Sequence, residues 1–360
     1  MLLHQAIEEK KRAWWLAPTH LMASQVWRDL KASARRLPDL ATSESERRID
    51  VPGGGMIAVR STHYPDNLRG EGLDLAVLDE AAYMEPRVWP EIVRPMLTTT
   101  RGSALFLSTP FGRNWFYDLF QKGIDARYQP EWQSFWFPTD RNPNIAAEEL
   151  ESIRRMTTEH IWGAEYRARF DDDSGQVFRG IRAAIARDPY PQAIAGRLYV
   201  AGVDWGRDRD YTVIVIIDAE ERRMVALDRF NQIGWGLQRG RLRAICDRWG
   251  PQQIWAEANS FGSPNIEALL EEGLPMRSFT TTSKSKSPLI ESLALAIERQ
   301  FISLLEHPVL LAELASYTLQ RLPGGGYRYG APPGMHDDTV MATALAWHGV
   351  EKRGSRIGFA

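Results

Sequence analysis

An aspartate that closes an apolar run is the first residue of this chain that could do chemistry. Residues 198–203 read Leu-Tyr-Val-Ala-Gly-Val, which is typical of a buried β-strand, and Asp204 follows at once. A polar turn containing Asp210 then leads into a second strand-like run at 213–217. A carboxylate at the end of a buried strand is held on a rigid element, as a catalytic metal site requires. Turns also use Asp often, so the interpretation depends on partner carboxylates.

Partner carboxylates occur at two later places. Glu257 ends a short strand expected at 253–257, and Asp337 and Asp338 begin the last expected helix. Mg²⁺ and Mn²⁺ prefer hard oxygen ligands. Two such ions about 4 Å apart can activate a water and stabilise the leaving oxygen in phosphodiester cleavage. Asp204, Asp210 and these three acids therefore predict a two-metal nuclease centre, with Asp204, Glu257 and Asp338 as its catalytic ligands.

Each acid also has a structural interpretation. Asp337 could cap its helix, which leaves Asp338 as the better ligand. Asp210 could be a turn residue, and Glu257 a solvated strand end. His336 could either orient the neighbouring acids or bind the metal. A set of three acids placed in this way is harder to explain by coincidence than any one of them.

The elements expected around these acids follow a recognisable order. Strands at 198–203, 211–217 and 224–230 precede a helix at about 236–249 and the strand at 253–257. Helices are expected at 263–272, 288–299 and 308–319, with a strand near 275–279. This is the order of a ribonuclease-H-like domain, in which the strand of Glu257 lies beside that of Asp204. The small residues Ala342, Ala344 and Ala346 would let the last helix pack closely on the sheet.

A second acidic motif lies in the first half of the chain. The apolar run 75–78 ends in Asp79 and Glu80, the Walker B pattern of P-loop ATPases. One such acid helps to hold magnesium on the nucleotide phosphates, and the other orients the attacking water. An apolar strand ending in Asp-Glu also arises by chance. A further strand ending in Ser108 and Thr109 makes chance less plausible, because it resembles the coupling motif that follows Walker B.

The phosphate-binding loop that such a site needs has no match in the sequence. No G-x-x-x-x-G-K-[ST] string occurs, and the glycine clusters 53–55 and 324–326 are better interpreted as turns. The chain begins in what resembles the helix after that loop, so we expect an N-terminal truncation. Either the gene model starts late, or the nucleotide site is genuinely broken. We therefore expect poor ATP hydrolysis.

The first half otherwise alternates strands and helices. Strands are expected at 12–17, 56–60, 75–79 and 104–107, a helix at 21–37, one more strand at 132–137, and a long helix from 142 to about 170. This alternation predicts a mostly parallel sheet covered on both faces. The polar stretch 171–175 marks the boundary, which gives an ATPase domain at 1–170, a linker at 171–195, a nuclease domain at 196–350 and a tail at 351–360.

Composition excludes several classes of protein. The net charge of −2 gives no global signal for nucleic acid, so DNA binding would need local patches. Cys246 is the only cysteine, which excludes an internal disulfide framework and a cysteine-based zinc site and fits a reducing cytoplasm. We find no apolar run long enough to span a bilayer.

Six short motifs together resemble the large terminase subunit of tailed bacteriophages, the genome-packaging motor. In chain order they read Ala-Pro-Thr at 17–19, Leu-Ala-Val-Leu-Asp-Glu at 75–80, Ser-Thr-Pro at 108–110, Val-Asp-Trp-Gly at 203–206, Ala-Glu-Ala at 256–258 and His-Asp-Asp at 336–338. The resemblance extends from about residue 12 to 347. It implies an α/β chain with a truncated P-loop (RecA/ASCE-like) ATPase domain followed by a ribonuclease-H-like nuclease domain.

The resemblance also implies roles and partners. Asp79 would be the magnesium-associated acid and Glu80 the catalytic glutamate, with Ser108 and Thr109 in the coupling motif. The nuclease would use Mg²⁺ or Mn²⁺ to cut concatemeric double-stranded DNA, and the full-length family member would use ATP with Mg²⁺ to translocate it. Implied partners are the portal protein, the small terminase subunit and further copies of the chain. The implied location is the host bacterial cytoplasm and, transiently, the portal vertex of the procapsid.

Alternatives remain open at this stage. The chain could be another ribonuclease-H-like enzyme, such as a resolvase or transposase, although the Walker-B-bearing half argues against it. It could also be an inactive prophage remnant that binds only DNA or portal. Candidate phosphate contacts are Lys284, Lys286, Arg239, Arg241 and Arg243, each of which could equally be a solvated surface residue. The sequence does not decide whether Arg101 or Arg113 is an arginine finger.

Overall fold

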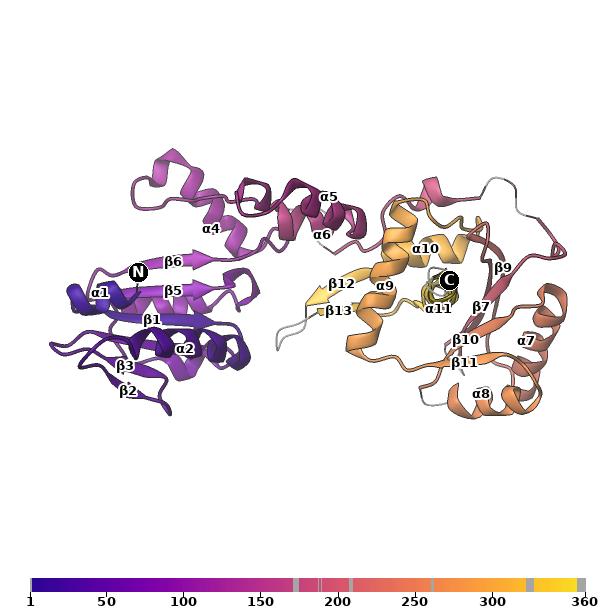
Figure 1. Ribbon diagram of the computed structural model, residues 1–360, viewed down its shortest axis with the longest axis horizontal. Helices are drawn as coiled ribbons and strands as arrows, with labels where there is room; N and C mark the ends of the chain where they lie inside the picture. Colours follow the sequence, from indigo (N-terminus) through magenta and orange to yellow (C-terminus); the bar gives the residue numbers. More distant parts are fainter. Residues whose placement is uncertain are drawn as a thin grey trace. The chain divides into compact units, whose positions relative to one another are not determined.

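The computed structural model describes residues 2–170, 175–186, 188, 190–206, 210–259, 262–321 and 327–354. Within them the chain forms two compact units, drawn in Figure 1. The first is made chiefly of 2–151 and 159–170, and the second of 152–158, 175–320 and 327–354. Residues 171–174 of the expected boundary 171–175, the glycine cluster 324–326 and the end of the tail from 355 lie outside the described residues.

The first unit is built on a six-stranded sheet with the order β2-β3-β4-β1-β5-β6. The strands are β1 Arg12–Ala17, β2 Ala41–Ser43, β3 Arg48–Asp50, β4 Met56–Ser61, β5 Leu75–Asp79 and β6 Ser103–Leu107. Strands β4, β1, β5 and β6 run parallel, while β2 and β3 add an antiparallel edge. The parallel part therefore brings the carboxyl ends of β1, β5 and β6 to one edge.

Both faces of this sheet are covered, as its long apolar strands require. The helices are α1 Leu2–Glu8, α2 His20–Ala34, α3 Arg94–Thr98 and α4 Trp115–Ile124, with a π-helical turn at Val88–Val93 before α3. Leu2 of α1 and Trp27 of α2 are buried with residues of one face. Met96 of α3 and Phe116 of α4 are buried with residues of the other face.

Two expectations for the end of the first half are wrong. Residues 132–137 form no strand: Phe135 and Phe137 are exposed, and the indole of Trp136 donates to the carbonyls of Arg167 and Ala168. The alternating aromatic residues thus resemble a strand in the sequence, but the segment pairs with no strand of the sheet, and Trp136 is held through its side chain.

The long helix expected from 142 to 170 is also broken into shorter pieces. These are α5 Ala147–Met156, α6 Glu159–Ile161 and a π-helical turn at Trp162–Tyr166. At the first break, the guanidinium of Arg299 donates to the carbonyls of Arg154 and Thr157. These carbonyls lie at the end of α5, where the helix cannot satisfy them itself. A residue far along the sequence therefore caps the helix end.

The second unit contains a five-stranded sheet with the order β11-β10-β7-β8-β9. The strands are β7 Tyr199–Asp204, β8 Thr212–Asp218, β9 Arg223–Phe230, β10 Gln253–Glu257 and β11 Met276–Phe279. Strands β7, β8 and β9 form an antiparallel meander, and β10 and β11 run parallel to β7. The expected ribonuclease-H-like order is confirmed, with the fourth strand beside the first.

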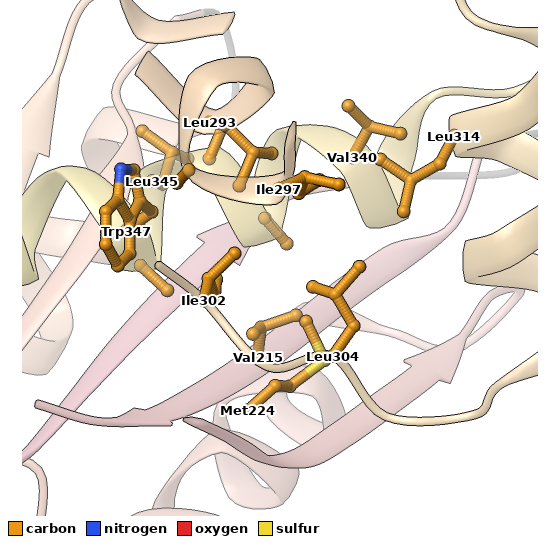
Figure 2. Close-up of a cluster of buried hydrophobic side chains, with 14 of the residues drawn as sticks. Val215, Met224, Leu293, Ile297, Ile302, Leu304, Leu314, Val340, Leu345 and Trp347 are labelled. Carbon is orange, nitrogen blue, oxygen red and sulfur yellow. The ribbon is translucent and has the colours of Figure 1, made fainter. Parts of the chain in front are cut away.

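Helices cover both faces of this sheet (Figure 1). They are α7 Trp235–Trp249, α8 Gly262–Glu271, α9 Ser283–Glu298, α10 Pro308–Ser316 and α11 Asp338–Gly354. Alternate residues of β8 enter opposite cores, with Ile214 packed among residues of α7 and α8 and Val215 among those of α9, α10 and α11. Figure 2 shows Leu293 and Ile297 of α9 close to Val340 and Leu345 of α11 in this second core. A small separate sheet pairs β12 Thr318–Arg321 with β13 Tyr327–Gly330.

A missing side chain in β7 lets α11 lie directly on the sheet. A Cβ added at Gly202 would stand 2.1 Å from the carbonyl oxygen of Ala342 and 2.4 Å from the amide nitrogen of Ala346. Both alanines are fully buried, as is Ala344. The close packing expected from the small residues of this helix is therefore confirmed. It places the first turn of α11 near the end of β7.

Candidate active site

Asp204 and Glu257 end neighbouring parallel strands of the second unit. Ala256 of β10 is paired with Val203 of β7, so the two acids that follow lie at the same sheet edge. The side-chain amide of Asn259 donates to Glu257 Oε1 at 3.1 Å and to the carbonyl of Thr281 at 2.8 Å. Asn259 therefore restrains the glutamate on one side.

Asp204 is surrounded by negative charge. Its side chain is buried, and burial raises its pKa well above the ordinary range of an aspartate. Repulsion by Glu257, a hydrogen bond with Glu257, and the charges of Asp338 and Asp337 raise the pKa further. Like charges gathered in a desolvated place are costly unless a proton or a cation compensates them.

Asp338 stands in the first turn of α11 and faces the start of β8. The backbone N–H of Tyr211 donates to Asp338 Oδ2 at 3.2 Å. Burial raises the pKa of Asp338 to about 6, and the Tyr211 amide opposes this rise. His336 Nδ1 lies 3.7 Å from Asp338 Oδ2 and 3.6 Å from Asp210 Oδ1. The imidazole thus lies within ion-pair distance of two candidate ligands.

Asp337 has an ion-pair partner. Its Oδ2 lies 3.0 Å from Lys286 Nζ, so this lysine, expected as a phosphate contact, instead pairs with an acid of the site. The N–H of Thr339, in the first turn of α11, donates to Glu313 of α10 at 2.8 Å. The side chain of Glu313 thus caps the N-terminus of α11, a role that was considered for Asp337.

Buried polar side chains also fasten the two ends of the turn between β7 and β8. The N–H of Gly206 donates to Thr212 Oγ1 at 2.9 Å, and Gln238 Nε2 donates to the carbonyls of Gly206 and Ile233. Thr212 and Gln238 are both buried. A Cβ at Gly206 would stand 2.4 Å from the carbonyl carbon of Tyr211, so the two ends of this turn approach closely at a glycine.

Sequence reasoning missed several of these residues. Glu313 left the clearest signal, since it is a single acid in the otherwise apolar helix α10. Thr212 and Gln238 left none, because each acts through a partner distant in sequence. Among the described residues, no group of three or more His, Cys, Asp or Glu side chains is arranged so that it could hold a metal ion.

The second acid pair lies at the end of β5 in the first unit. Burial raises the pKa of both Asp79 and Glu80. Asp79 Oδ2 accepts a hydrogen bond from the indole of Trp15 at 3.2 Å, and Glu80 adopts a left-handed backbone with φ of 52°. This backbone turns the chain sharply at the strand tip. Glu165 adds a further negative charge near Glu80.

The residues after β6 contact this acid pair. Ser108 Oγ donates to Glu80 Oε2 at 3.2 Å and accepts from the N–H of Ala82, and the N–H of Thr109 donates to Glu80. Neighbouring parallel strands thus bring Ser108 and Thr109 to Glu80.

Three of the remaining basic candidates have local partners. Arg241 pairs with Asp228 and Arg243 with Glu272, while Arg113 lies over the ring of Tyr117. Arg101 adopts a left-handed backbone with φ of 54° in the turn before β6. None of the described helices is long and apolar enough to cross a membrane.

Comparison with known proteins relates both units to one family. The family described as "Terminase large subunit, T4likevirus-type, N-terminal" matches residues 2–185. The large terminase subunit of Thermus virus P23-45 is 29% identical over 381 residues, which covers 93% of this chain and 78% of that protein.

One solved structure gives the same picture of the fold, and a second is similar over the second half of the chain. The large terminase of a thermophilic bacteriophage has a TM-score of 0.51 and 13% identity, and covers 93% of this chain and 85% of that one. The magnesium-bound large terminase nuclease of phage G20c is 27% identical over 48% of this chain and 97% of that chain, with a TM-score of 0.46. The expected α/β class, a P-loop-type ATPase fold followed by a ribonuclease-H-like fold, is confirmed. By its sequence match over half its length and by this fold, the chain belongs to the large terminase subunits of phages.

Proposed function

We propose that the second unit is a divalent-metal-dependent endonuclease that cuts concatemeric viral DNA in genome packaging. One observation carries the proposal: the ends of β7 and β10 lie side by side, and Asp338 of α11 accepts from the residue before β8, so that Asp204, Glu257 and Asp338 gather at one edge of the sheet. A phosphodiester nuclease of the two-metal type needs such a cluster of carboxylates on rigid elements.

The donor chemistry fits Mg²⁺ or Mn²⁺. The cluster offers carboxylate oxygens, which are the hard ligands these ions prefer. Glu257 lies close enough to Asp204 to raise its pKa, and a bound cation would offset the repulsion between the two carboxylates. Asp204, Glu257 and Asp338 would hold the metal, with Asp210 and Asp337 adjoining. Their side chains would have to converge further on binding, because in the metal-free chain no three described acids are already arranged around one point.

Bound metal would supply an activated water and charge stabilisation at the leaving oxygen. The chain's own residues position the ligands. Asn259 restrains Glu257, and the N–H of Tyr211 holds Asp338. Lys286 partly neutralises Asp337.

For the first unit we propose the ATP-dependent role of the family's motor. Asp79 would associate with the magnesium of ATP, Glu80 would orient the attacking water, and Ser108 and Thr109 would couple the site to the neighbouring strand. The hydrogen bond from Ser108 to Glu80 supports this assignment. The sequence has no G-x-x-x-x-G-K-[ST] string, so ATP turnover by this chain is expected to be poor.

The proposed partners follow from this function. The substrate is double-stranded DNA, and the docking partners are the portal protein, the small terminase subunit and further copies of the chain around the portal. The proposed setting is the host bacterial cytoplasm, with transient residence at the portal vertex of the procapsid.

Incubation of supercoiled plasmid with the chain and Mn²⁺ tests the nuclease. We expect cutting that disappears on chelation with EDTA and in Asp204→Ala. Asp247→Ala is the matched control, because Asp247 is an exposed acid of the same unit. Absence of cutting with every divalent metal would contradict the nuclease and favour a remnant that only binds DNA or portal. ATP turnover clearly above background would contradict the expectation for the first unit.

A further inference from the structure

The carboxylate of Asp338 depends on two elements that are separate in sequence. It is carried by the first turn of α11, and it accepts the N–H of Tyr211, the residue before β8. If the two elements shifted relative to each other, the carboxylate would lose either its backbone donor or its place at the sheet edge. Something must therefore hold the start of α11 against the start of β8.

Glu313 holds the start of α11. Its Oε2 accepts from both the N–H and the hydroxyl of Thr339, the residue after Asp338. A carboxylate at a helix N-terminus accepts from an N–H that has no partner within the helix, and its negative charge interacts favourably with the helix dipole. Glu313 is only 6% exposed, so its charge is desolvated, and such a residue needs a cationic or hydrogen-bonding partner.

Arg229 of β9 lies between Glu313 and Tyr211. Its Nη2 is 3.8 Å from Glu313 Oε1, and its guanidinium carbon stands 3.2 Å from the centre of the Tyr211 ring. Arg229 is paired with Val213 of the antiparallel strand β8, and this pairing fixes the position of Arg229 in the sheet. The same ring meets His336 edge-on at 5.5 Å between centroids. One arginine thus contacts both residues that determine the place of Asp338.

We propose that Glu313 and Arg229 are positioning residues that lock the start of α11 to the start of β8 and so hold the Asp338 carboxylate in place for metal binding. Neither residue touches the reacting atoms in this proposal. It rests on the proposed nuclease function for its catalytic consequence, but the locking itself is a property of the metal-free chain.

Four variants separate positioning from simple loss of stability. Glu313→Leu removes the acceptor at similar size, whereas Glu313→Gln keeps an oxygen that can accept from Thr339. Arg229→Lys keeps the charge and removes the planar group over Tyr211. Arg197→Leu is the control, because it breaks another ion pair to a buried acid, Asp218, at the opposite end of β8.

The first readout is amide hydrogen exchange in the full chain without metal, on peptides that contain Tyr211 or Thr339. We expect exchange at Thr339 to be about 10-fold faster in Glu313→Leu, because the variant removes a hydrogen bond to a charged acceptor. Exchange at Tyr211 should be faster in Arg229→Lys. Glu313→Gln should stay near the wild type, and Arg197→Leu should leave both peptides unchanged after correction for global stability.

The second readout is the Mn²⁺ concentration that gives half of the metal-induced rise in Tm, measured together with plasmid cutting. Glu313→Leu should raise this Mn²⁺ midpoint by about 10-fold and lower the rate of plasmid cutting by about 10-fold. Both values should return toward those of the wild type in Glu313→Gln. Unchanged exchange and an unchanged midpoint in both Glu313→Leu and Arg229→Lys would overturn the proposal. If the wild type neither binds Mn²⁺ nor cuts DNA, the nuclease function fails, while the exchange result still decides whether the lock exists.

Discussion

The two acidic sites of this chain are built in opposite ways. Asp79 and Glu80 are consecutive residues at the tip of one strand, and each has a neutral donor, from Trp15 and Ser108. Asp204 instead meets Glu257 and Asp338 from two other elements and faces negative charge. The two acids of the first site are thus adjacent in the sequence, whereas those of the second come together only when the sheet and α11 have formed. The second should therefore be more sensitive to packing and more dependent on a cation.

The largest effect should come from breaking the packing that assembles the second site. Gly202→Ala places a Cβ 2.1 Å from the Ala342 carbonyl, so α11 must move away from β7. We expect a loss of about 3 kcal/mol in the unfolding free energy of the second unit, and a fall in plasmid cutting of roughly 10²-fold because Asp338 is displaced. Urea denaturation and a cutting assay measure the two effects.

Gly240→Ala is the matched control for this experiment. Gly240 lies in α7, and no heavy atom stands within 4 Å of the added Cβ. Alanine should therefore stabilise the helix by about 0.5–1 kcal/mol and leave cutting unchanged. Equal behaviour of the two variants would show that the approach of α11 to Gly202 is unimportant.

The next effect concerns charge. In metal-free protein, Asp204→Asn should stabilise the second unit by about 1–2 kcal/mol, because it removes a buried charge that faces other acids. Asp79→Asn should stabilise the first unit by less, since Trp15 already donates to Asp79. Hydrogen exchange in increasing urea, read on peptides from each unit, measures both. A destabilised Asp204→Asn variant would contradict the electrostatic difference between the sites.

The contrast between the sites also explains which parts of the fold and of the second site could be predicted from the sequence. The strand-end acids and the small residues of α11 were visible because buried strands and close helix packing leave apolar runs and alanines in the sequence. The order of strands placed Glu257 beside Asp204 because ribonuclease-H-like topology leaves few alternatives. The roles of the individual acids stay predictions.

Other features could not be predicted because distant partners decide them. The helix expected from 142 to 170 is broken where Arg299 caps the end of α5, and residues 132–137 look like a strand because Trp136 and its neighbours alternate aromatic side chains. Glu313 caps α11 although it belongs to another helix. In each case a long-range contact outweighs the local pattern.

A smaller effect should separate the first site from the second. Ser108→Ala removes the hydroxyl that joins Glu80 to the N–H of Ala82. We expect a loss of about 1 kcal/mol in the first unit, the usual size for a partly buried hydrogen bond. Mn²⁺-dependent cutting should not change, because its carboxylates all belong to the second unit. A parallel loss of cutting would show that the two sites are coupled.

The smallest effect should come from Asp218, an acid of β8 that contrasts with Asp204 of the same sheet. Burial alone would raise its pKa, but hydrogen bonds from Tyr190, Arg197 and two backbone amides lower it below the ordinary value. A lowered pKa in the folded state means that the ionised form stabilises the fold at pH above the unfolded value of about 4, and that this contribution is lost as the pH falls through the folded value. The unfolding free energy of the wild type should therefore fall below about pH 4 more steeply than that of Asp218→Asn. Urea denaturation from pH 7 to 3 tests this, and parallel curves for the two proteins would contradict it.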